Sequence, residues 1–309
     1  MQSKIAIIGL GGVGGYYGGL LSRYSEQYPE KLSVYFIARG AHLEKIKEKG
    51  LTVITETGTF VTRPALATHQ PSEIGEVDYL IIASKSYDLD EVAGQVRPLV
   101  GPATILLPLL NGIDNVSRLR AHFPGNEVWY GCAYIIARLN EPGVVESSGN
   151  VHHLHFGHEK RSSPELEYIE DLFKQAGIEA SLKAEAIRAI WRKFFYISTT
   201  AALTTYLNTG FRDLVWNEEY KPLYIELMQE LFAVSQAENI GLSGSLIDDM
   251  MRYGGSLPAG TTSSMNSDYL AGRRIEVETL VGVVVRLAHK HRVEVPLYEK
   301  IYKALVVNC

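Results

Sequence analysis

The sequence predicts an α/β protein in which an N-terminal, doubly wound sheet is followed by an all-helical C-terminal domain. In the first half, short apolar runs alternate with helical patterns, beginning with strands at Lys4–Ile8 and Ser33–Ala38 and a helix at Tyr16–Tyr24 between them. From Ala184 onward nearly every pattern is helical. Because 309 residues exceed what one compact core usually serves, we expect two domains, residues 1–183 and residues 184–309.

The other expected elements follow the same two patterns. In the first domain they are a helix at Ala41–Lys49, strands at Asp78–Ser84 and Ala103–Leu109 around a helical stretch at Leu89–Leu99, strands at Val128–Ile136 and Val151–Phe156 that extend the sheet to about Gly157, a turn at Asn140–Gly143, a helix at Pro164–Ala176 and a strand at Ile178–Leu182. In the second domain they are helices at 185–207, 219–238 and 244–253, a long element ending near Lys290, and a helix at 296–307.

The composition argues against several classes of protein. A net charge of -5 does not suit a nucleic-acid-binding protein, which needs a broad basic surface. No apolar run approaches the roughly 20 residues that span a bilayer, and the start of the chain lacks a signal-peptide pattern, so we expect a cytoplasmic protein. Cys132 and Cys309 offer neither a disulfide framework nor a zinc spacing, and we expect two reduced thiols.

A glycine-rich turn, Gly9-Leu10-Gly11-Gly12-Val13-Gly14, follows the first expected strand and precedes the first expected helix. In a G-x-G-x-x-G turn the first glycine permits a tight turn, the second lets the backbone approach a pyrophosphate, and the third allows close strand–helix packing. The helix N-terminus then offers free N–H groups to the anion. The residues from Lys4 to about Arg39 therefore predict a dinucleotide-binding βαβ unit of the Rossmann type, in a nicotinamide-dependent oxidoreductase.

The end of the second strand indicates which dinucleotide is bound. NAD-specific sites usually carry an acidic residue there, but this chain has Arg39. An arginine suits a 2′-phosphate through charge-assisted hydrogen bonds, so we expect NADPH. A solvated arginine after a strand is the alternative.

Two further positions follow expected strands at the edge where ligands of open α/β sheets bind. Lys85 is a candidate contact to the cofactor, with a surface lysine as the alternative. The amide of Asn111, before Gly112, could hold cofactor ribose and substrate, with a simple turn as the alternative. In the helical part, Lys193 stands in an apolar helix and either snorkels outward or lines a polar cleft.

These motifs together resemble those of the ketopantoate reductase (2-dehydropantoate 2-reductase) family, across nearly the whole chain. The likeness is carried, in order, by the Gly9–Gly14 loop, Arg39, Lys85, Asn111-Gly112, Trp191-Arg192-Lys193, Ser263-Ser264-Met265 and Glu276. The family's fold, a Rossmann domain followed by a helical domain, agrees with the fold expected above. The resemblance implies that Lys193 is the catalytic lysine, that Asn111 touches cofactor and substrate, and that Ser264 contacts substrate. It also implies that Glu276 is an active-site carboxylate reaching the cofactor and that Ala137 contacts the cofactor through its backbone.

The reaction implied is hydride transfer from NADPH to the C2 carbonyl of a 2-oxo acid, with ketopantoate as the expected substrate and pantothenate biosynthesis as its setting. Reduction places negative charge on the carbonyl oxygen, so a nearby cation or acid lowers the barrier, and Lys193 is the candidate. Glu276 would orient that lysine or a substrate hydroxyl.

The chain departs from the family at the substrate site. Ile197, Ala201 and Phe211 stand where well-studied members present asparagines, and Thr261 stands where an asparagine is also expected. The first three side chains cannot form the hydrogen bonds that select a substrate hydroxyl. Another branched or bulkier 2-oxo acid is therefore a second expected substrate class, unless Ser198, Thr199 and Thr200, which lie nearby, supply the missing polar groups.

Two other functions stay open on the sequence alone. One is a related dehydrogenase acting on hydroxy acids, glycerol phosphate or opine-type amino acids, and the other is a catalytically silent NADPH-binding regulatory protein. The apolar helices, Leu280–Leu287 among them, are compatible with a homodimer as well as with the domain's own core. Four histidines, 152, 153, 155 and 158, alternate across a strand and so split between its faces, and we expect no metal site.

Overall fold

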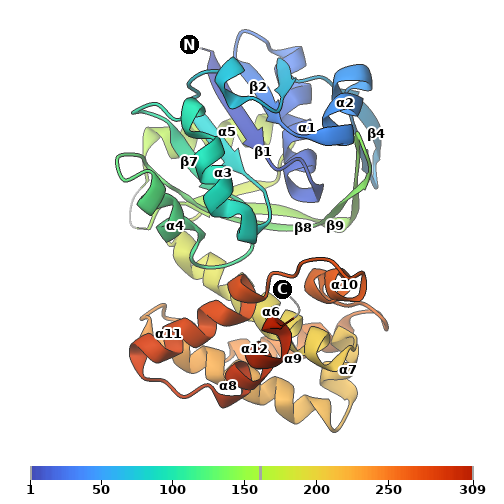
Figure 1. Cartoon of the computed structure of the whole chain (residues 1–309), viewed down its shortest axis with the longest axis vertical. Coiled ribbons are helices and arrows are strands. Elements are labelled where there is room, and N and C mark those ends of the chain that lie inside the picture. Colours follow the sequence, from blue (N-terminus) through green and yellow to red (C-terminus); the bar gives the residue numbers. More distant parts are fainter. Residues whose placement is uncertain (1, 160–161, 308–309) are drawn as a thin grey trace. The chain divides into compact units, whose positions relative to one another are not determined.

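The computed structural model describes residues 2–159 and 162–307, so Cys309, named in the sequence analysis, lies outside the described residues. The chain forms two compact units. The first consists of residues 1–110 and 115–186, and the second consists of Asn111–Asp114 and residues 187–309. Figure 1 shows that the strands belong to the first unit and that the second is helical.

A five-stranded parallel sheet forms the centre of the first unit. Its strands are β1 (Ser3–Ile8), β2 (Leu32–Ile37), β5 (Leu66–Thr68), β6 (Tyr79–Ile82) and β7 (Ile105–Pro108), in the order β5-β2-β1-β6-β7. Every neighbouring pair is parallel, which confirms the predicted Rossmann-like fold. The chain moves from β1 to β2 on one side and later to β6 on the other, so the carboxyl ends of β1 and β6 form the switch point where ligands of such sheets bind.

A second sheet covers the outer side of the first helix, α1 (Gly12–Gln27), and was not foreseen. It contains β3 (Leu51–Thr55), β4 (Gly58–Thr62), β8 (Tyr130–Glu141), β9 (Val144–Gly157) and β10 (Ala180–Leu182). Its order is β10-β9-β3-β4, with β8 antiparallel to β9. The prediction that residues 128–157 extend the first sheet is confirmed only at Val128, which forms a parallel bridge with Leu106 of β7, and is wrong for β8 and β9. The turn expected at Asn140–Gly143 is confirmed, since it joins β8 to β9.

Glycines in α1 explain why this second sheet fits so closely. A Cβ at Gly15 would overlap a methyl group of Val145 on β9, and a Cβ at Gly19 would lie 2.5 Å from a methyl group of Val53 on β3. At Gly18, on another face of α1, a Cβ would lie 3.2 Å from the ring of Phe36 on β2. The helix is thus packed between two sheets, and their buried side chains form one apolar core.

Three further helices of the first unit, α2 (Gly40–Lys49), α3 (Leu89–Gln95) and α5 (Pro164–Gln175), lie within a few residues of their predicted positions. A fourth, α4 (Asn115–His122), was not predicted. The stretch expected to be helical to Leu99 instead ends as α3 and continues as a short 3₁₀ turn, Arg97–Leu99. Proline at position 98 has no N–H to continue the α-helical pattern.

The second unit contains α6 (Ala186–Leu207), α7 (Phe211–Trp216), α8 (Tyr220–Ala237), α9 (Leu246–Ser256), α10 (Ser264–Leu270), a π-helical turn (Glu278–Gly282), α11 (Val283–His291) and α12 (Pro296–Val306). The long element expected to end near Lys290 does end there, at His291, but its helix begins only at residue 277. The residues before it form α10 and a loop that contains Gly272 at φ +65°. Over residues 2–159 and 162–307, none of the helices has the length and apolarity needed to cross a bilayer.

Candidate active site

Three glycines of the loop lie close against other backbone atoms, whereas Gly11 lies beside open space. A Cβ at Gly9 would overlap the backbone of Ala83 and Ser84 beyond β6, and one at Gly14 would overlap the carbonyl oxygen of Gly9. A Cβ at Gly12 would overlap the carbonyl of Ala137. At Gly11, by contrast, no described protein atom beyond the glycine and its chain neighbours lies within 4 Å of that position. The free space and the exposed N–H groups at the start of α1 fit a dinucleotide pyrophosphate.

The other residues of the loop are oriented by the core. Leu10 is buried among the apolar side chains and Val13 packs against them. A contact of either residue with a cofactor would therefore be made by its backbone, as the loop's proposed role requires.

The second strand ends where the sequence predicted, and Arg39 follows it. Arg39 is the N-cap residue of α2 and its side chain is exposed. An exposed guanidinium directly after β2 is available to a 2′-phosphate.

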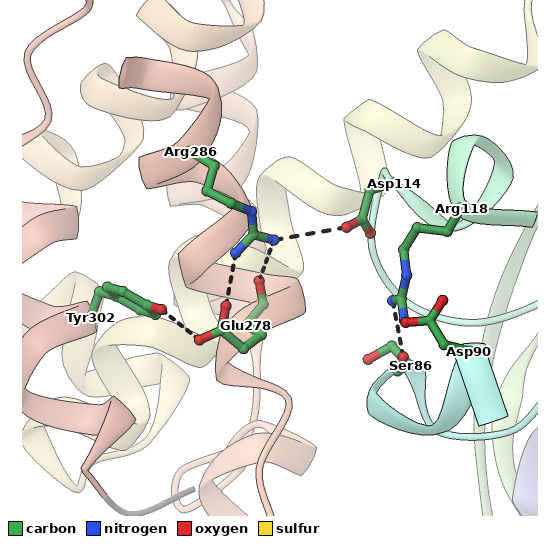
Figure 2. A network of polar contacts seen from close by, with 7 residues as sticks. All are labelled: Ser86, Asp90, Asp114, Arg118, Glu278, Arg286 and Tyr302. Carbon is green, nitrogen blue, oxygen red and sulfur yellow. Dashed lines mark hydrogen bonds and ion pairs between the residues drawn. The ribbon is translucent and has the colours of Figure 1, made fainter. Parts of the chain in front are cut away.

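Lys85 follows β6 at the beginning of a short 3₁₀ turn, Ser86–Asp88, and is half-buried. This turn is held to α4 by Arg118, which donates to the Ser86 carbonyl at 3.0 Å and pairs with Asp90 at 2.7 Å (Figure 2). The hydrogen bond from Arg118 lowers the pKa of Asp90. Beside Lys85, the hydroxyl of Ser84 is buried without a hydrogen-bond partner among the described residues, and a bound polar group would satisfy it.

Ala137 reaches the glycine loop because β8 is irregular. The pairing of β8 with β9 shifts between Ile135 and Ile136, and Ala137 follows at once. Such irregularities re-aim a strand locally and are common beside functional sites. Here the result is that the Ala137 backbone faces Gly12.

In the helical unit, Lys193 is neither buried in the core nor fully solvated. Trp191, Phe194 and Phe195 turn the apolar side of α6 inward, and Lys193 stays half-buried. Its Nζ donates a hydrogen bond to Oδ1 of Asn111 at 3.0 Å. Asn111 follows β7 in sequence but belongs to the helical unit in space. The structure therefore brings together two candidate residues that lie 82 positions apart in the sequence.

Glu276 and Ser264 lie in the same unit as Lys193. Glu276 is 5% exposed and directly precedes the turn of helix before α11. Ser264 is exposed at the first turn of α10. The loop before it is fastened to α6, since the hydroxyls of Ser263 and Thr204 form a hydrogen bond of 2.8 Å.

The face of α6 that carries Lys193 continues as an apolar face. Ile197 and Ala201 follow at intervals of four residues, which places them on the lysine's side of the helix. Phe211, at the start of α7, donates its backbone N–H to the Thr261 carbonyl at 2.8 Å. The structure thus leaves these positions without the polar groups that the family pattern led us to expect.

Ser198, Thr199 and Thr200 do not replace the missing asparagines. All three are buried in the helical unit. Ser198 donates to the Leu280 carbonyl and bonds with the Tyr298 hydroxyl, and Thr199 and Thr200 donate to carbonyls one turn back in α6. Their hydroxyls donate within the core of the unit, so these residues do not supply the missing polar groups.

The sheet, its glycine turn and the helical unit together define the class of an oxidoreductase with a Rossmann-like domain and a helical C-terminal domain. Within this class, the chain belongs to the ketopantoate reductase family. The sequence model of the family "Ketopantoate reductase PanE/ApbA" matches residues 5–160, and that of "Ketopantoate reductase PanE/ApbA C terminal" matches residues 185–307.

Three similar proteins illustrate the likeness. The crystal structure of 2-dehydropantoate 2-reductase from Porphyromonas gingivalis W83 is 33% identical, with a TM-score of 0.88 over 99% of this chain and 100% of that one. The 2-dehydropantoate 2-reductase of Halobacterium salinarum is 28% identical over 95% of each chain. The uncharacterized oxidoreductase YkpB of Bacillus subtilis is 27% identical over 98% of this chain and 97% of its own length.

Proposed function

We propose that the protein reduces a 2-oxo acid to a 2-hydroxy acid with NADPH, and that its substrate is 2-dehydropantoate (ketopantoate), which yields pantoate for pantothenate and coenzyme A synthesis. The observation that carries the proposal is the hydrogen bond from Lys193 to Asn111. It holds the lysine ammonium against an amide oxygen in the helical unit, which matches the family's C-terminal domain. Two relatives named 2-dehydropantoate 2-reductase support the choice of substrate.

In this proposal residues 1–183 bind the cofactor, which supplies the hydride. The Gly9–Gly14 loop binds the pyrophosphate through backbone N–H groups, and Arg39 binds the 2′-phosphate. Lys85 and the backbone of Ala137 add contacts to the same ligand. Residues 184–309 bind the substrate, with Ser264 as a hydrogen-bonding contact.

Lys193 carries the chemical step in the proposal. Reduction places negative charge on the carbonyl oxygen, and the ammonium of Lys193 stabilises that charge and donates the proton that the product hydroxyl needs. Asn111 accepts from Nζ and so limits the directions in which the ammonium can point. Glu276, a buried carboxylate, orients the lysine or a substrate hydroxyl. That the protein forms a homodimer and that it is located in the cytoplasm stay predictions.

A pair of substrates that differ by one hydroxyl tests the proposal most directly. Ketopantoate and 2-oxo-3,3-dimethylbutanoate have the same carbon skeleton, and only the first carries the 4-hydroxyl. We expect ketopantoate to be reduced with a kcat/KM well above that of the analogue. The decrease in NADPH absorbance measures the rate for each acid. Tight NADPH binding without turnover on either acid, or on a panel of other 2-oxo acids, would instead identify a silent binding protein.

A second candidate is a reductase of a bulky apolar 2-oxo acid, and the apolar residues Ile197, Ala201 and Phe211 favour it. A site that hydrogen-bonds a substrate hydroxyl rejects the analogue lacking it by roughly 10⁴-fold, whereas an apolar pocket discriminates weakly. If the analogue, or an aromatic acid such as phenylglyoxylate, exceeds ketopantoate in kcat/KM, this candidate replaces the first.

Arg39 is expected to select NADPH over NADH. Arg39→Gln should weaken NADPH binding by about tenfold or more, because a charge-assisted hydrogen bond to the 2′-phosphate contributes roughly 1.5–3 kcal/mol. NADH binding should change little, since that cofactor has no 2′-phosphate. Titration of both cofactors by fluorescence measures the two affinities. Equal losses for the two cofactors would remove Arg39 from this role.

A further inference from the structure

The segment Asn111–Asp114 is held on the helical unit at three successive points, although it joins β7 to α4 of the first unit in sequence. The side chain of Asn111 accepts from Lys193, and Ile113 packs against the helical unit's core. Asp114 forms an ion pair with Arg286 of α11, with 3.9 Å between Oδ2 and Nη2. The position of the Asn111 amide therefore depends on what holds the other end of a four-residue segment.

Arg286 is itself fixed by a polar cluster formed with Glu278 and Tyr302, which Figure 2 shows beside Asp114. Its Nη1 lies 2.8 Å from Oε2 of Glu278, and its Nη2 also donates to the Glu278 carbonyl at 3.4 Å. The Tyr302 hydroxyl donates to the other carboxylate oxygen of Glu278. A guanidinium held on one side by carboxylate and carbonyl keeps a defined direction for its remaining N–H groups.

The backbone leaves the space that this cluster needs. A Cβ at Gly282 would lie 2.7 Å from Oε2 of Glu278, 2.9 Å from the Tyr302 ring and 3.1 Å from Nη1 of Arg286. A glycine inside a helical segment costs stability because of its backbone freedom, and here the residue admits the three side chains. The π turn from Glu278 to Gly282 lies in the same place, and such turns are frequent at functional sites.

We propose that Arg286 is a positioning residue for the reduction, which ties together the two segments that carry Asn111 and Glu276. Asn111 stands three residues before Asp114, one partner of Arg286, and Glu276 stands two residues before Glu278, the other. Arg286 acts on the reaction through these partners, by fixing the amide that accepts from Lys193 and the chain that presents Glu276. This inference rests on the proposed function of Lys193 and Asn111.

The contribution of Arg286 to stability should be small, because its side chain is 53% exposed and exposed ion pairs are weak. Its contribution to the reaction should be larger, since rate depends steeply on the placement of a catalytic group. Arg286→Gln should therefore lower kcat about fivefold to tenfold and change the Kd for NADPH much less, because the glycine loop and Arg39 supply the main proposed contacts to the cofactor. Arg286→Lys, which keeps the charge on a similar stem, should restore part of the loss.

A matched control lies one turn further along α11. Lys290 is an exposed cation that pairs with Glu238 at 2.8 Å, and Lys290→Gln should leave kcat unchanged. Asp114→Asn breaks the same link as Arg286→Gln from the other side, so the double variant should be no slower than the slower single one. Unchanged kcat in Arg286→Gln, an equal loss in Lys290→Gln, or additive losses in the double variant would each overturn the proposal.

Amide hydrogen exchange gives a readout that does not depend on turnover. In Arg286→Gln the backbone amides of residues 111–114 and 276–278 should exchange faster than in the unchanged protein, while those of α8 should not. If the unchanged protein reduces no 2-oxo acid but this local effect is seen, the proposed reaction fails and the structural link stands. If exchange is unaltered at both segments, Arg286 does not position them, whatever the reaction.

Discussion

Lys193→Ala is expected to lower kcat for the 2-oxo acid by about a thousandfold, because one side chain supplies both charge stabilisation and a proton in the step. The Kd for NADPH should stay within about twofold of the unchanged value, since Lys193 itself is not among the expected cofactor contacts. Single-turnover measurement of NADPH oxidation, together with a fluorescence titration of NADPH, separates the two effects. The ammonium donates to Asn111, so removal of the side chain also leaves that amide without this donor.

Two variants define the specificity of this effect. Arg192→Ala removes the exposed neighbouring cation and should leave kcat nearly unchanged. Lys193→Arg keeps a positive charge but transfers a proton poorly, because a guanidinium stays protonated. It should therefore recover only a small part of the rate. A Lys193→Ala enzyme that keeps more than about a tenth of its kcat would assign the proton transfer to another group.

The sequence predicted the sheet and the glycine turn because their information is local. The Gly9–Gly14 spacing, a preceding apolar strand and a following helix predict one structure within about 20 residues. Gly9 forms the tight turn and Gly14 the close packing that were assigned to them, whereas the approach of Gly11 to a pyrophosphate stays a prediction. Arg39 and Lys85 were placed correctly after β2 and β6 for the same reason. What those two side chains bind stays a prediction.

The second sheet was missed because strand pairing is not local. Residues 128–157 read correctly as strands, but an apolar run does not state which strand it will pair with. The hairpin of β3 and β4 had a visible pattern, with Leu51 and Val53 alternating with polar residues before Gly58, and it went unrecognised. The glycines at positions 15 and 19 of α1 also indicated a close neighbour, since both lie on a helix face that meets side chains of that sheet.

The polar contacts of the candidate site could also be predicted only in part, because they join residues far apart in the sequence. From the sequence, Lys193 could either snorkel outward or line a polar site. Only the fold shows its hydrogen bond with Asn111, which lies 82 residues away in the sequence. Ser198, Thr199 and Thr200 could not be excluded from the site until their bonds within the core were known. Arg286 gave a weak signal as a charged residue in an otherwise apolar stretch, but Asp114 is far from it in sequence and the pair could not be inferred.

Gly11→Ala is expected to weaken NADPH binding by about a hundredfold while the protein remains folded. Gly11 has an extended backbone, φ -75° and ψ -156°, which alanine adopts readily, and no described protein atom lies within 4 Å of an added Cβ. The methyl group would instead occupy the space proposed for the pyrophosphate and prevent its hydrogen bonds to the backbone, a loss of roughly 3 kcal/mol. A titration with NADPH gives the affinity, and thermal unfolding without cofactor should show a Tm within a few degrees of the unchanged protein.

Gly12→Ala is a control for the position of the added methyl group, which at Gly12 would overlap the protein itself and at Gly11 would occupy the space proposed for the ligand. Its Cβ would overlap the Ala137 carbonyl, so this variant should lose stability before any cofactor is added, by about 2 kcal/mol or more. Gly94→Ala, in α3 with no described atom within 4 Å of its Cβ, controls for the general effect of adding a methyl group. If Gly11→Ala binds NADPH normally, the pyrophosphate does not lie against Gly11 and the loop is only a structural turn. If Gly11→Ala destabilises the protein as much as Gly12→Ala, the space at Gly11 belongs to the protein itself and its affinity change carries no information about the cofactor.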